Sequence, residues 1–251
     1  QVEKGLETLT WVPKLTIIRV GENPDDISYE KGATKKLTSF GLEVESKVFP
    51  GDISDEAFKK EFAAINADAS VDGILMLRPL PKQINEQDIE KMIDPAKDLD
   101  GISPVNIAKV FSGDTSGFAP CTAEAVVCML KMNDIALSGK RVAVVGRSMV
   151  VGRPLSMLLL HENATVTICH SRTQNLAEVC RRADILVAAV GKAGFITPDM
   201  VKDGAVVIDV GINRNAEGKV CGDVAPEVME KASFMTPVPG GAGPMTITML
   251  M

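Results

Sequence analysis

The feature that most constrains the fold of this chain is the alternation of short apolar, β-rich runs with helix-like stretches. In the first half, strands are expected over 15–20, 44–49 and 73–77, with helices between them over 27–40 and 55–66. Ser54 is a suitable N-cap for the second helix, and the acidic side chains of Asp55 and Glu56 favour its first turn. A βαβαβ order of this kind places the strands in a parallel sheet that helices cover.

A second series of the same kind follows a stretch rich in glycine and serine, Ser112–Pro120, which we interpret as a domain boundary. Thr122 is expected to cap a helix that ends near Met132. Further strands are expected over 141–145, 165–169, 185–189 and 205–210, with helices over 154–162 and 175–182. The sequence therefore predicts an α/β protein with two domains, each built on a parallel sheet.

Composition narrows the classes of function. The 251 residues are 45% apolar and 24% charged, as in an ordinary soluble globular protein, and the net charge is −6. An acidic chain without a basic block is a poor partner for nucleic acid or an anionic membrane, and no apolar run approaches the ~18 residues of a membrane span. The five cysteines include no CxxC pair, and there are two histidines, so we expect no metal site and reduced thiols in the cytoplasm.

The strand expected over 141–145 leads into a turn bounded by two glycines, Gly146–Pro154. Because a glycine has no side chain, the backbone can approach a phosphate closely there, and the N-terminus of the following helix favours anions. The turn is not a full GxGxxG motif, since only Gly146 and Gly152 are present. We interpret it as a dinucleotide-binding turn, with an ordinary strand–helix connection as the alternative.

A dinucleotide-binding fold reads the adenosine ribose at the end of its next strand. Here that position holds His170-Ser171-Arg172-Thr173, which offers no carboxylate for a ribose diol. Ser171 and Arg172 can instead hold a 2′-phosphate, which favours NADP over NAD. A solvated surface turn is the alternative reading of these residues.

The junction Asp209–Asn213 follows another expected strand. Ligands of an open parallel sheet gather beyond the carboxyl ends of its strands, so Gly211 and Ile212 are expected on the nicotinamide side. Asp209 belongs to that site or only caps the loop.

Three further segments stand out. Gly73–Pro81 ends an apolar strand with a proline-rich turn, Pro95–Gly101 puts two carboxylates in a turn, and Pro237–Thr246 is a glycine-rich loop that opens a helix. By chemistry alone, the commoner role of Asp98 and Asp100 would be to accept backbone hydrogen bonds.

Together these segments resemble the methylenetetrahydrofolate dehydrogenase/cyclohydrolase family over nearly the whole chain. The resemblance lies in the order and spacing of LRPLP, KDLDG, PCT, VVGRSMVVGRP, VIDVGIN and TPVPGGAGPMT. It implies a parallel-sheet folate domain over 1–119, a Rossmann-type domain over 120–236, and a loop and helix start over 237–251 that return to the first domain. It also implies further sequence before Gln1 and a terminal helix past Met251.

The activity that the resemblance implies is oxidation of 5,10-methylenetetrahydrofolate to the 5,10-methenyl cation, in a homodimer, with hydride passing to NADP or, as the alternative, NAD. No proton leaves carbon, so the step demands alignment rather than a strong base. Tyr29 and Asp100 match the catalytic, pterin-contacting positions. The other implied substrate positions are those of Leu77, Pro239, Gly240 and Gly241. The implied cofactor residues are Gly146, Arg147, Ser148, Ser171 and Ile212, and Arg172 is added to them from the reading of the strand end.

The sequence departs from the family at two cyclohydrolase positions. Ala33 stands where bifunctional members carry a lysine, and Leu77 stands where they carry a glutamine. We therefore expect a dehydrogenase with weak or lost cyclohydrolase activity. The alternatives are a bifunctional enzyme in which another lysine, such as Lys36, substitutes, an idle ligand-binding protein, and a protein resembling shikimate dehydrogenase. Lys36 shares a helix face with Tyr29 but lies about 10.5 Å further along the axis.

Overall fold

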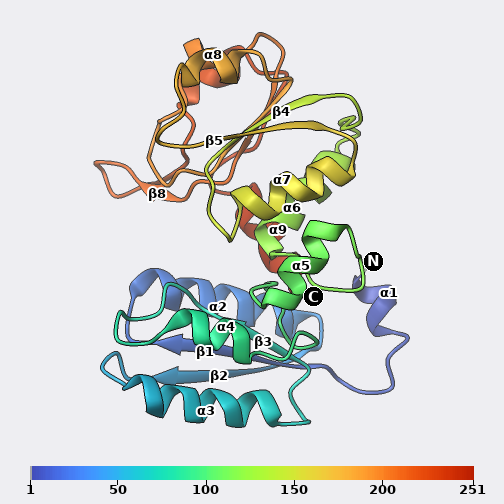
Figure 1. Ribbon diagram of the computed structural model, residues 1–251, viewed down its shortest axis with the longest axis vertical. Helices are drawn as coiled ribbons and strands as arrows, with labels where there is room; N and C mark the ends of the chain where they lie inside the picture. The colour runs from blue at the N-terminus through green and yellow to red at the C-terminus, as the bar shows by residue number, and fades with distance from the viewer. Residues whose placement is uncertain (1) are drawn as a thin grey trace. The chain divides into compact units, whose positions relative to one another are not determined.

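The computed structural model describes residues 2–251. Contacts divide the chain into two compact units, each an α/β structure (Figure 1). The first unit contains the residues up to Lys109, with Asp114–Ala119 and Leu250–Met251. The second contains Val110–Gly113 and Pro120–Met249.

The first unit is a three-stranded parallel sheet in the order β2-β1-β3. Its elements are α1 (Val2–Leu6), β1 (Lys14–Val20), α2 (Pro24–Ser39), β2 (Glu43–Phe49), α3 (Asp55–Ala67), β3 (Gly73–Met76), α4 (Glu86–Met92) and α5 (Pro104–Ser112), which runs across the division between the units. In Figure 1, α2 covers one face of this sheet and α3 covers the other. The predicted parallel βαβαβ arrangement is confirmed.

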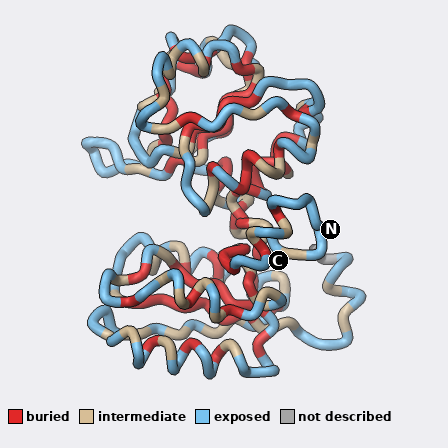
Figure 2. The backbone as a smooth tube through the Cα atoms, viewed as in Figure 1, coloured by how far each residue is buried: buried red, intermediate tan, exposed pale blue. Residues whose placement is uncertain are grey.

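The core of the first unit follows from strand alternation. Ile18 and Val20 of β1 point to the same face as Ile74 and Met76 of β3, because side chains alternate with a period of two. That face packs against α3, whose residues Phe58 and Phe62 are fully buried. The buried residues trace the strands and the inner sides of the helices (Figure 2).

Two helix starts show how local chemistry sets the boundaries. The predicted cap of α3 is confirmed, because Ser54 Oγ accepts a hydrogen bond from the Ala57 N–H at 3.2 Å. The helix α2 begins at Pro24, three residues before the expected start. Asn23 caps it by accepting the Asp25 N–H, and a proline fits the first helical position because no N–H is needed there.

The second unit contains a five-stranded parallel sheet in the order β10-β7-β6-β4-β5 and a small antiparallel pair, β8-β9. Its strands are β4 (Arg141–Val145), β5 (Thr165–Cys169), β6 (Ile185–Ala188), β7 (Val206–Asp209), β8 (Asn213–Arg214), β9 (Val220–Cys221) and β10 (Phe234–Met235). Its helices are α6 (Cys121–Met132), α7 (Gly152–His161), α8 (Leu176–Arg181), α9 (Ala242–Met249) and the 3-10 helices η1 (Pro198–Met200) and η2 (Pro226–Glu230).

Two hydrophobic cores lie on the two faces of this larger sheet. The face against α6 and α7 carries Val142, Val144, Ile185, Val187 and Ile208. The face against α8 and the 3-10 helices carries Ala143, Val145, Leu186, Ala188 and Val207. A sheet buried on both faces explains why these strands read as continuous apolar runs.

Two expectations differ from the structure at α6 and α9. Thr122 does not cap α6, which begins at Cys121 after Pro120 and has no side-chain cap. The hydroxyl of Thr122 instead accepts a 3.4 Å hydrogen bond from Thr246 of α9. Residues 237–249 group with the second unit rather than the first, because α9 packs on α6 and buries Ala242 in its core. Across residues 2–251 no helix is both long and apolar enough to cross a membrane.

Candidate functional site

The carboxyl edge of the five-stranded sheet contains a topological switch point. From β4 the chain crosses through α7 to β5 on one side, and then through α8 to β6 on the other side. Open parallel sheets bind ligands at the carboxyl ends of two strands that diverge in this way. The residues at this point are Gly146 after β4 and Ala189 after β6.

Two glycines allow the backbone to pack tightly at the switch point. Gly146 has φ +133°, and a Cβ added to it would overlap the carbonyl oxygen of Ala189. A Cβ added to Gly152, the first residue of α7, would overlap the carbonyl oxygen of Gly146. The two glycines thus hold the β4 turn between the β6 loop and the N-terminus of α7, where the backbone N–H groups favour an anion.

Arg147 and Ser148 lie in this turn with exposed side chains. The hydroxyl of Ser148 accepts the Val151 N–H at 3.1 Å, and its carbonyl accepts the Arg153 N–H at 3.0 Å. Ser148 therefore shapes the turn, and its hydroxyl proton remains available to donate to a phosphate oxygen.

At the end of β5, a small turn is held by its own hydrogen bonds. The His170 N–H donates to Thr173 Oγ1 at 2.8 Å, and the Arg172 N–H donates to His170 Nδ1 at 3.1 Å. Ser171 and Arg172 are both exposed on this turn. Their predicted role as ligands of a 2′-phosphate stays a prediction.

At the end of β7, Asp209 is fully buried and its carboxylate accepts three backbone N–H bonds, from Gly211, Asp223 and Val224. Burial raises the pKa of this carboxyl group, and the three N–H donors oppose the shift. The structure supports the loop-capping alternative for Asp209. Ile212 is 70% exposed at the same edge, and its predicted contact with the cofactor stays a prediction.

Asp223 is a residue that the sequence analysis missed. It is fully buried and accepts hydrogen bonds from the loop after β6 and from Asn213. Its only sequence signal is the pair Gly222-Asp223, which is common in ordinary turns.

In the first unit, the two neighbouring aspartates of the KDLDG turn have separate roles. Asp98 is fully buried and accepts hydrogen bonds from the Ile102 and Ser103 N–H groups at 2.9 and 2.8 Å, and from Asn106 Nδ2 at 2.9 Å. Asp100 is half-buried, and its carboxylate lies 3.9 Å from the guanidinium of Arg78. The fold therefore uses Asp98 internally and leaves Asp100 partly exposed, and the predicted contact of Asp100 with a pterin stays a prediction.

Arg78, also missed by the sequence analysis, gathers three carboxylates at the end of β3. Its guanidinium lies 3.3 Å from Glu86, 3.2 Å from Glu90 and 3.9 Å from Asp100, with 12% of the side chain exposed. An arginine is always ionised, so it keeps a favourable charge beside Asp100. Burial raises the pKa of Glu90, and Arg78 opposes this shift.

The cyclohydrolase positions of the first unit are both buried and apolar. Leu77 follows β3, with its N–H bonded to the Ile18 carbonyl, and 9% of it is exposed. Ala33 is fully buried on α2, and Tyr29 lies one helical turn before it, half-buried. Lys36 is exposed, and its ammonium lies 4.8 Å from the centre of the Phe40 ring.

The remaining expected folate residues lie in the second unit, in the loop between β10 and α9. Pro239 and Gly240 are exposed, and Gly240 has φ +108°. Gly241 is buried, and a Cβ added there would lie 2.5 Å from the Pro237 carbonyl oxygen. Tyr29, Leu77 and Asp100 belong to the first unit.

The comparisons with known proteins decide the family. Residues 1–100 match the family model described as tetrahydrofolate dehydrogenase/cyclohydrolase, catalytic domain. Residues 120–251 match the model for the NAD(P)-binding domain of the same family. This chain belongs to the tetrahydrofolate dehydrogenase/cyclohydrolase family. The fold class and the resemblance inferred from the sequence are confirmed, and the resemblance to shikimate dehydrogenase is set aside.

Individual members of the tetrahydrofolate dehydrogenase/cyclohydrolase family are similar to this chain over most of their length. A protein of Clostridium kluyveri named bifunctional protein FolD is 52% identical, with 95% of this chain and 84% of the relative covered. The crystal structure of the bifunctional FolD enzyme of Campylobacter jejuni is 40% identical, with a TM-score of 0.95 over 99% of this chain and 89% of that one. The Trypanosoma brucei enzyme, solved with NADP cofactor and an inhibitor, is 33% identical, with a TM-score of 0.92 over 99% and 90%.

The names of these relatives can be compared with the expected loss of cyclohydrolase activity. All three are named as bifunctional or as dehydrogenase-cyclohydrolases. Their names do not support the expectation of a weak or lost cyclohydrolase, and they favour the bifunctional alternative. Two apolar substitutions therefore carry less weight than the similarity of the whole chain.

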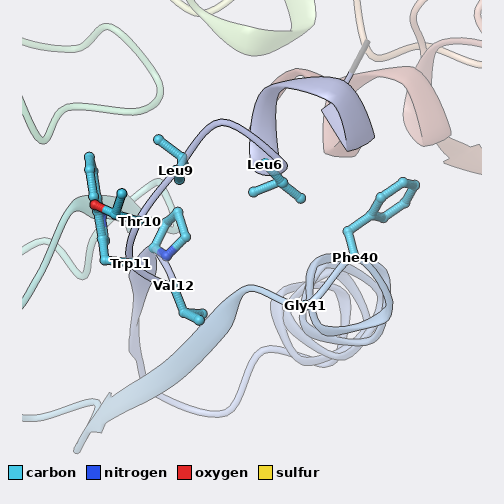
Figure 3. Close-up of a pocket in the computed structure, with 8 residues that line it drawn as sticks. Leu6, Leu9, Thr10, Trp11, Val12, Phe40 and Gly41 are labelled. Atoms are coloured by element: carbon cyan, nitrogen blue, oxygen red, sulfur yellow. The ribbon is translucent and has the colours of Figure 1, made fainter.

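One cavity of the described residues has no predicted site residue in its lining. It has a volume of about 300 Å³ and is shown in Figure 3. It lies in the first unit, and its lining is Leu6, Leu9, Thr10, Trp11, Val12, Pro13, Phe40 and Gly41. Its lining includes no charged side chain that could pair with the pterin amide–amine edge, and we assign no substrate to it. No group of three or more metal-ligating side chains was found within residues 2–251.

Proposed function

We propose that this protein is a bifunctional 5,10-methylenetetrahydrofolate dehydrogenase/5,10-methenyltetrahydrofolate cyclohydrolase that uses NADP. The observation that carries the dehydrogenase half is the switch point of the NAD(P)-binding domain, where Gly146 and Gly152 let the turn after β4 pack closely against the β6 loop and the start of α7. The names of the relatives support the cyclohydrolase half. The test is a two-step assay on purified protein. NADPH absorbance should rise after methylenetetrahydrofolate is added, and methenyl absorbance should then decay faster than in buffer.

The proposed mechanism of hydride transfer uses the chain mainly for binding and alignment. NADP, when bound, supplies the hydride-accepting ring. The Gly146 turn and the α7 N-terminus hold the pyrophosphate, and Asp100 accepts the N–H groups of the pterin amide–amine edge. Because no proton leaves carbon, the chain needs no strong base in this step, and a missing lysine at position 33 does not affect it.

The proposed preference for NADP rests on the turn after β5. Arg172→Ala is expected to lower kcat/KM for NADP by about 10- to 100-fold, because a charge-assisted contact to the 2′-phosphate is lost. The kcat/KM for NAD should stay within about twofold, since NAD has no 2′-phosphate. Arg182→Ala is a matched control, because Arg182 is exposed in the same unit and pairs with Glu178. A parent enzyme that clearly prefers NAD would refute the cofactor assignment.

The cyclohydrolase step requires a proton-transfer group other than Ala33 or Leu77. The same side of α2 carries Asp26, which is three residues before Tyr29 and half-buried. Burial raises the pKa of Asp26, a direction that suits acid–base work nearer neutral pH, and Arg19 opposes the shift. Glu30, on the same face, is bound by Arg19 at 2.6 Å. We therefore propose Asp26 as the acid–base group.

Asp26→Asn is expected to slow methenyl decay by about 100-fold while hydride transfer stays within about threefold. A carboxyl with a raised pKa destabilises the fold once it ionises, so Asn at this position should not lower the melting temperature near neutral pH. Asp25→Asn is the control, since Asp25 is exposed in the same helical turn. Lys36→Ala should leave decay within about twofold, because its ammonium lies over Phe40. If Lys36→Ala instead abolishes the decay of methenyl absorbance, Lys36 is the group that substitutes for the missing lysine.

The proposed assembly is a homodimer. The strand β5 is an edge strand of the larger sheet, and Ile168 on it is 37% exposed. Unpaired edges of this kind are suited to pairing with a second copy. Light scattering should give twice the mass of one chain. We also propose a cytoplasmic location, because an odd number of cysteines without a CxxC pair favours reduced thiols.

A further inference from the structure

The buried carboxylate of Asp223 accepts four hydrogen bonds. Its Oδ2 accepts the Val190 and Gly191 N–H groups at 2.6 and 3.0 Å. Its Oδ1 accepts the Lys192 N–H at 2.8 Å and Asn213 Nδ2 at 2.9 Å. The residue is 0% exposed, so these protein groups satisfy it in place of water.

These donors come from the two loops on one side of the switch point. Val190–Lys192 follow β6, and Asn213 follows β7 directly after Ile212. One carboxylate therefore ties both loops together. Asp223 is itself held, because its N–H donates to the buried Asp209 at 2.9 Å.

The hydrogen bonds also decide which backbone groups face the switch point. In a trans peptide the N–H and C=O groups point in opposite directions. The Val190 N–H points to Asp223, and the carbonyl of the same peptide, that of Ala189, lies against the Cα of Gly146. Asp223 thus fixes the orientation of the peptide between Ala189 and Val190, with its N–H toward Asp223 and its carbonyl toward the Gly146 turn.

The strand order indicates which half of a dinucleotide these loops meet. The adenosine ribose is read at the end of β5, which lies on one side of β4. The loops tied by Asp223 follow β6 and β7, on the other side of β4. A dinucleotide that spans the switch point therefore places its nicotinamide–ribose half, with its carboxamide and hydroxyl donors, beside the Asp223 loops.

We propose that Asp223 is a positioning residue for the nicotinamide–ribose half of the cofactor. It acts without touching the cofactor, by holding the loops after β6 and β7 so that backbone carbonyls accept hydrogen bonds from that half. The inference rests on the proposed use of a nicotinamide dinucleotide.

The test compares two ligands on Asp223→Asn. The amide keeps the shape of the carboxylate but replaces one acceptor oxygen by an NH₂ group, which then faces two N–H donors. The dissociation constant for NADP should rise at least ~10-fold, since the loops lose their anchor. That for 2′,5′-ADP, which lacks the nicotinamide half, should stay within about twofold. The KM for methylenetetrahydrofolate should also stay within about twofold.

Asp184→Asn is the matched control. Asp184 also accepts a backbone N–H, from Arg141 at 3.0 Å, and pairs with Lys202 at 2.6 Å, but it precedes β6 at the opposite edge of the sheet. It should lower the melting temperature without changing either dissociation constant. If Asp223→Asn does not fold, Asn213→Ala removes a single tie and should weaken NADP alone by about two- to fivefold.

Unchanged NADP binding, or an equal loss for NADP and 2′,5′-ADP, would overturn the inference. If the parent protein binds NAD rather than NADP, the same comparison is made with NAD and 5′-AMP. The assignment of NADP then fails, but the positioning role of Asp223 is still tested. If the parent binds neither dinucleotide, the proposed function and this inference both fail.

Discussion

Gly146→Ala is expected to remove most NADP binding and to destabilise the second unit. An added Cβ at this position would overlap the carbonyl oxygen of Ala189, and φ is +133°, where side chains are rarely found. Backbone atoms cannot rotate aside as a flexible side chain can, so β4 and β6 must separate at the switch point. Strain and overpacking together cost about 2–5 kcal/mol, and we expect a melting temperature about 5–15 °C lower.

The measurement is the dissociation constant for NADP beside the melting temperature. NADP binding should weaken by at least ~10-fold, because the phosphate-binding turn is displaced. Gly204→Ala is the matched control, since Gly204 also has positive φ, +75°, but a Cβ there meets nothing within 4 Å. Gly204→Ala therefore has the backbone strain of a positive φ but no steric overlap of the added Cβ. It should leave NADP binding unchanged. If Gly146→Ala binds NADP as the parent does, the switch point is not the cofactor site.

Asp100→Ala is expected to lower kcat/KM for methylenetetrahydrofolate by about 10- to 150-fold, with little change in stability. The carboxylate is half-buried beside Arg78, and the loss of one charge-assisted partner costs roughly 1.5–3 kcal/mol of binding. The effect should appear mainly in the KM for the folate. The dissociation constant for NADP should not change, because the cofactor is bound by the other unit.

Asp98→Ala is the comparison that separates the two aspartates. It would leave three buried donors, from Ile102, Ser103 and Asn106, without their acceptor. The cost should reach at least ~3 kcal/mol, so the first unit should unfold at a clearly lower temperature. If Asp100→Ala oxidises folate as well as the parent, the assignment of the folate site is wrong. If Asp98→Ala is as stable as the parent, the division of roles fails.

The two cyclohydrolase positions show a limit of reading single residues. Ala33 and Leu77 are apolar where a bifunctional enzyme needs polar groups, which predicts loss of that activity. The similar bifunctional relatives favour the opposite conclusion. A catalytic step depends on which groups surround the substrate in space, and α2 brings Asp26 to the same side as Ala33. Helix spacing offers candidate substitutes in other turns, such as Lys36, but only the structure shows that Asp26 is half-buried and that burial raises its pKa.

Local signals placed most helices and strands well. The Ser54 cap and the apolar strands were predictable because they depend on neighbouring residues only. The start of α2 and the role of Thr122 were misplaced, since a cap depends on which donor the side chain reaches. The short helix α4 and the pair β8-β9 were not predicted, because such elements have no long apolar period.

The sequence by itself determined the fold class and the family, because periodicity and motif spacing are properties of the chain as written. The tertiary structure decided which acidic residues are buried to serve the fold and which stay partly exposed. Asp98, Asp209 and Asp223 are buried and bonded to backbone N–H groups, whereas Asp100 lies at the edge beside Arg78. A carboxylate has the same chemistry at each position, and only the donors that reach it through space, from segments up to 33 residues away, assign its role.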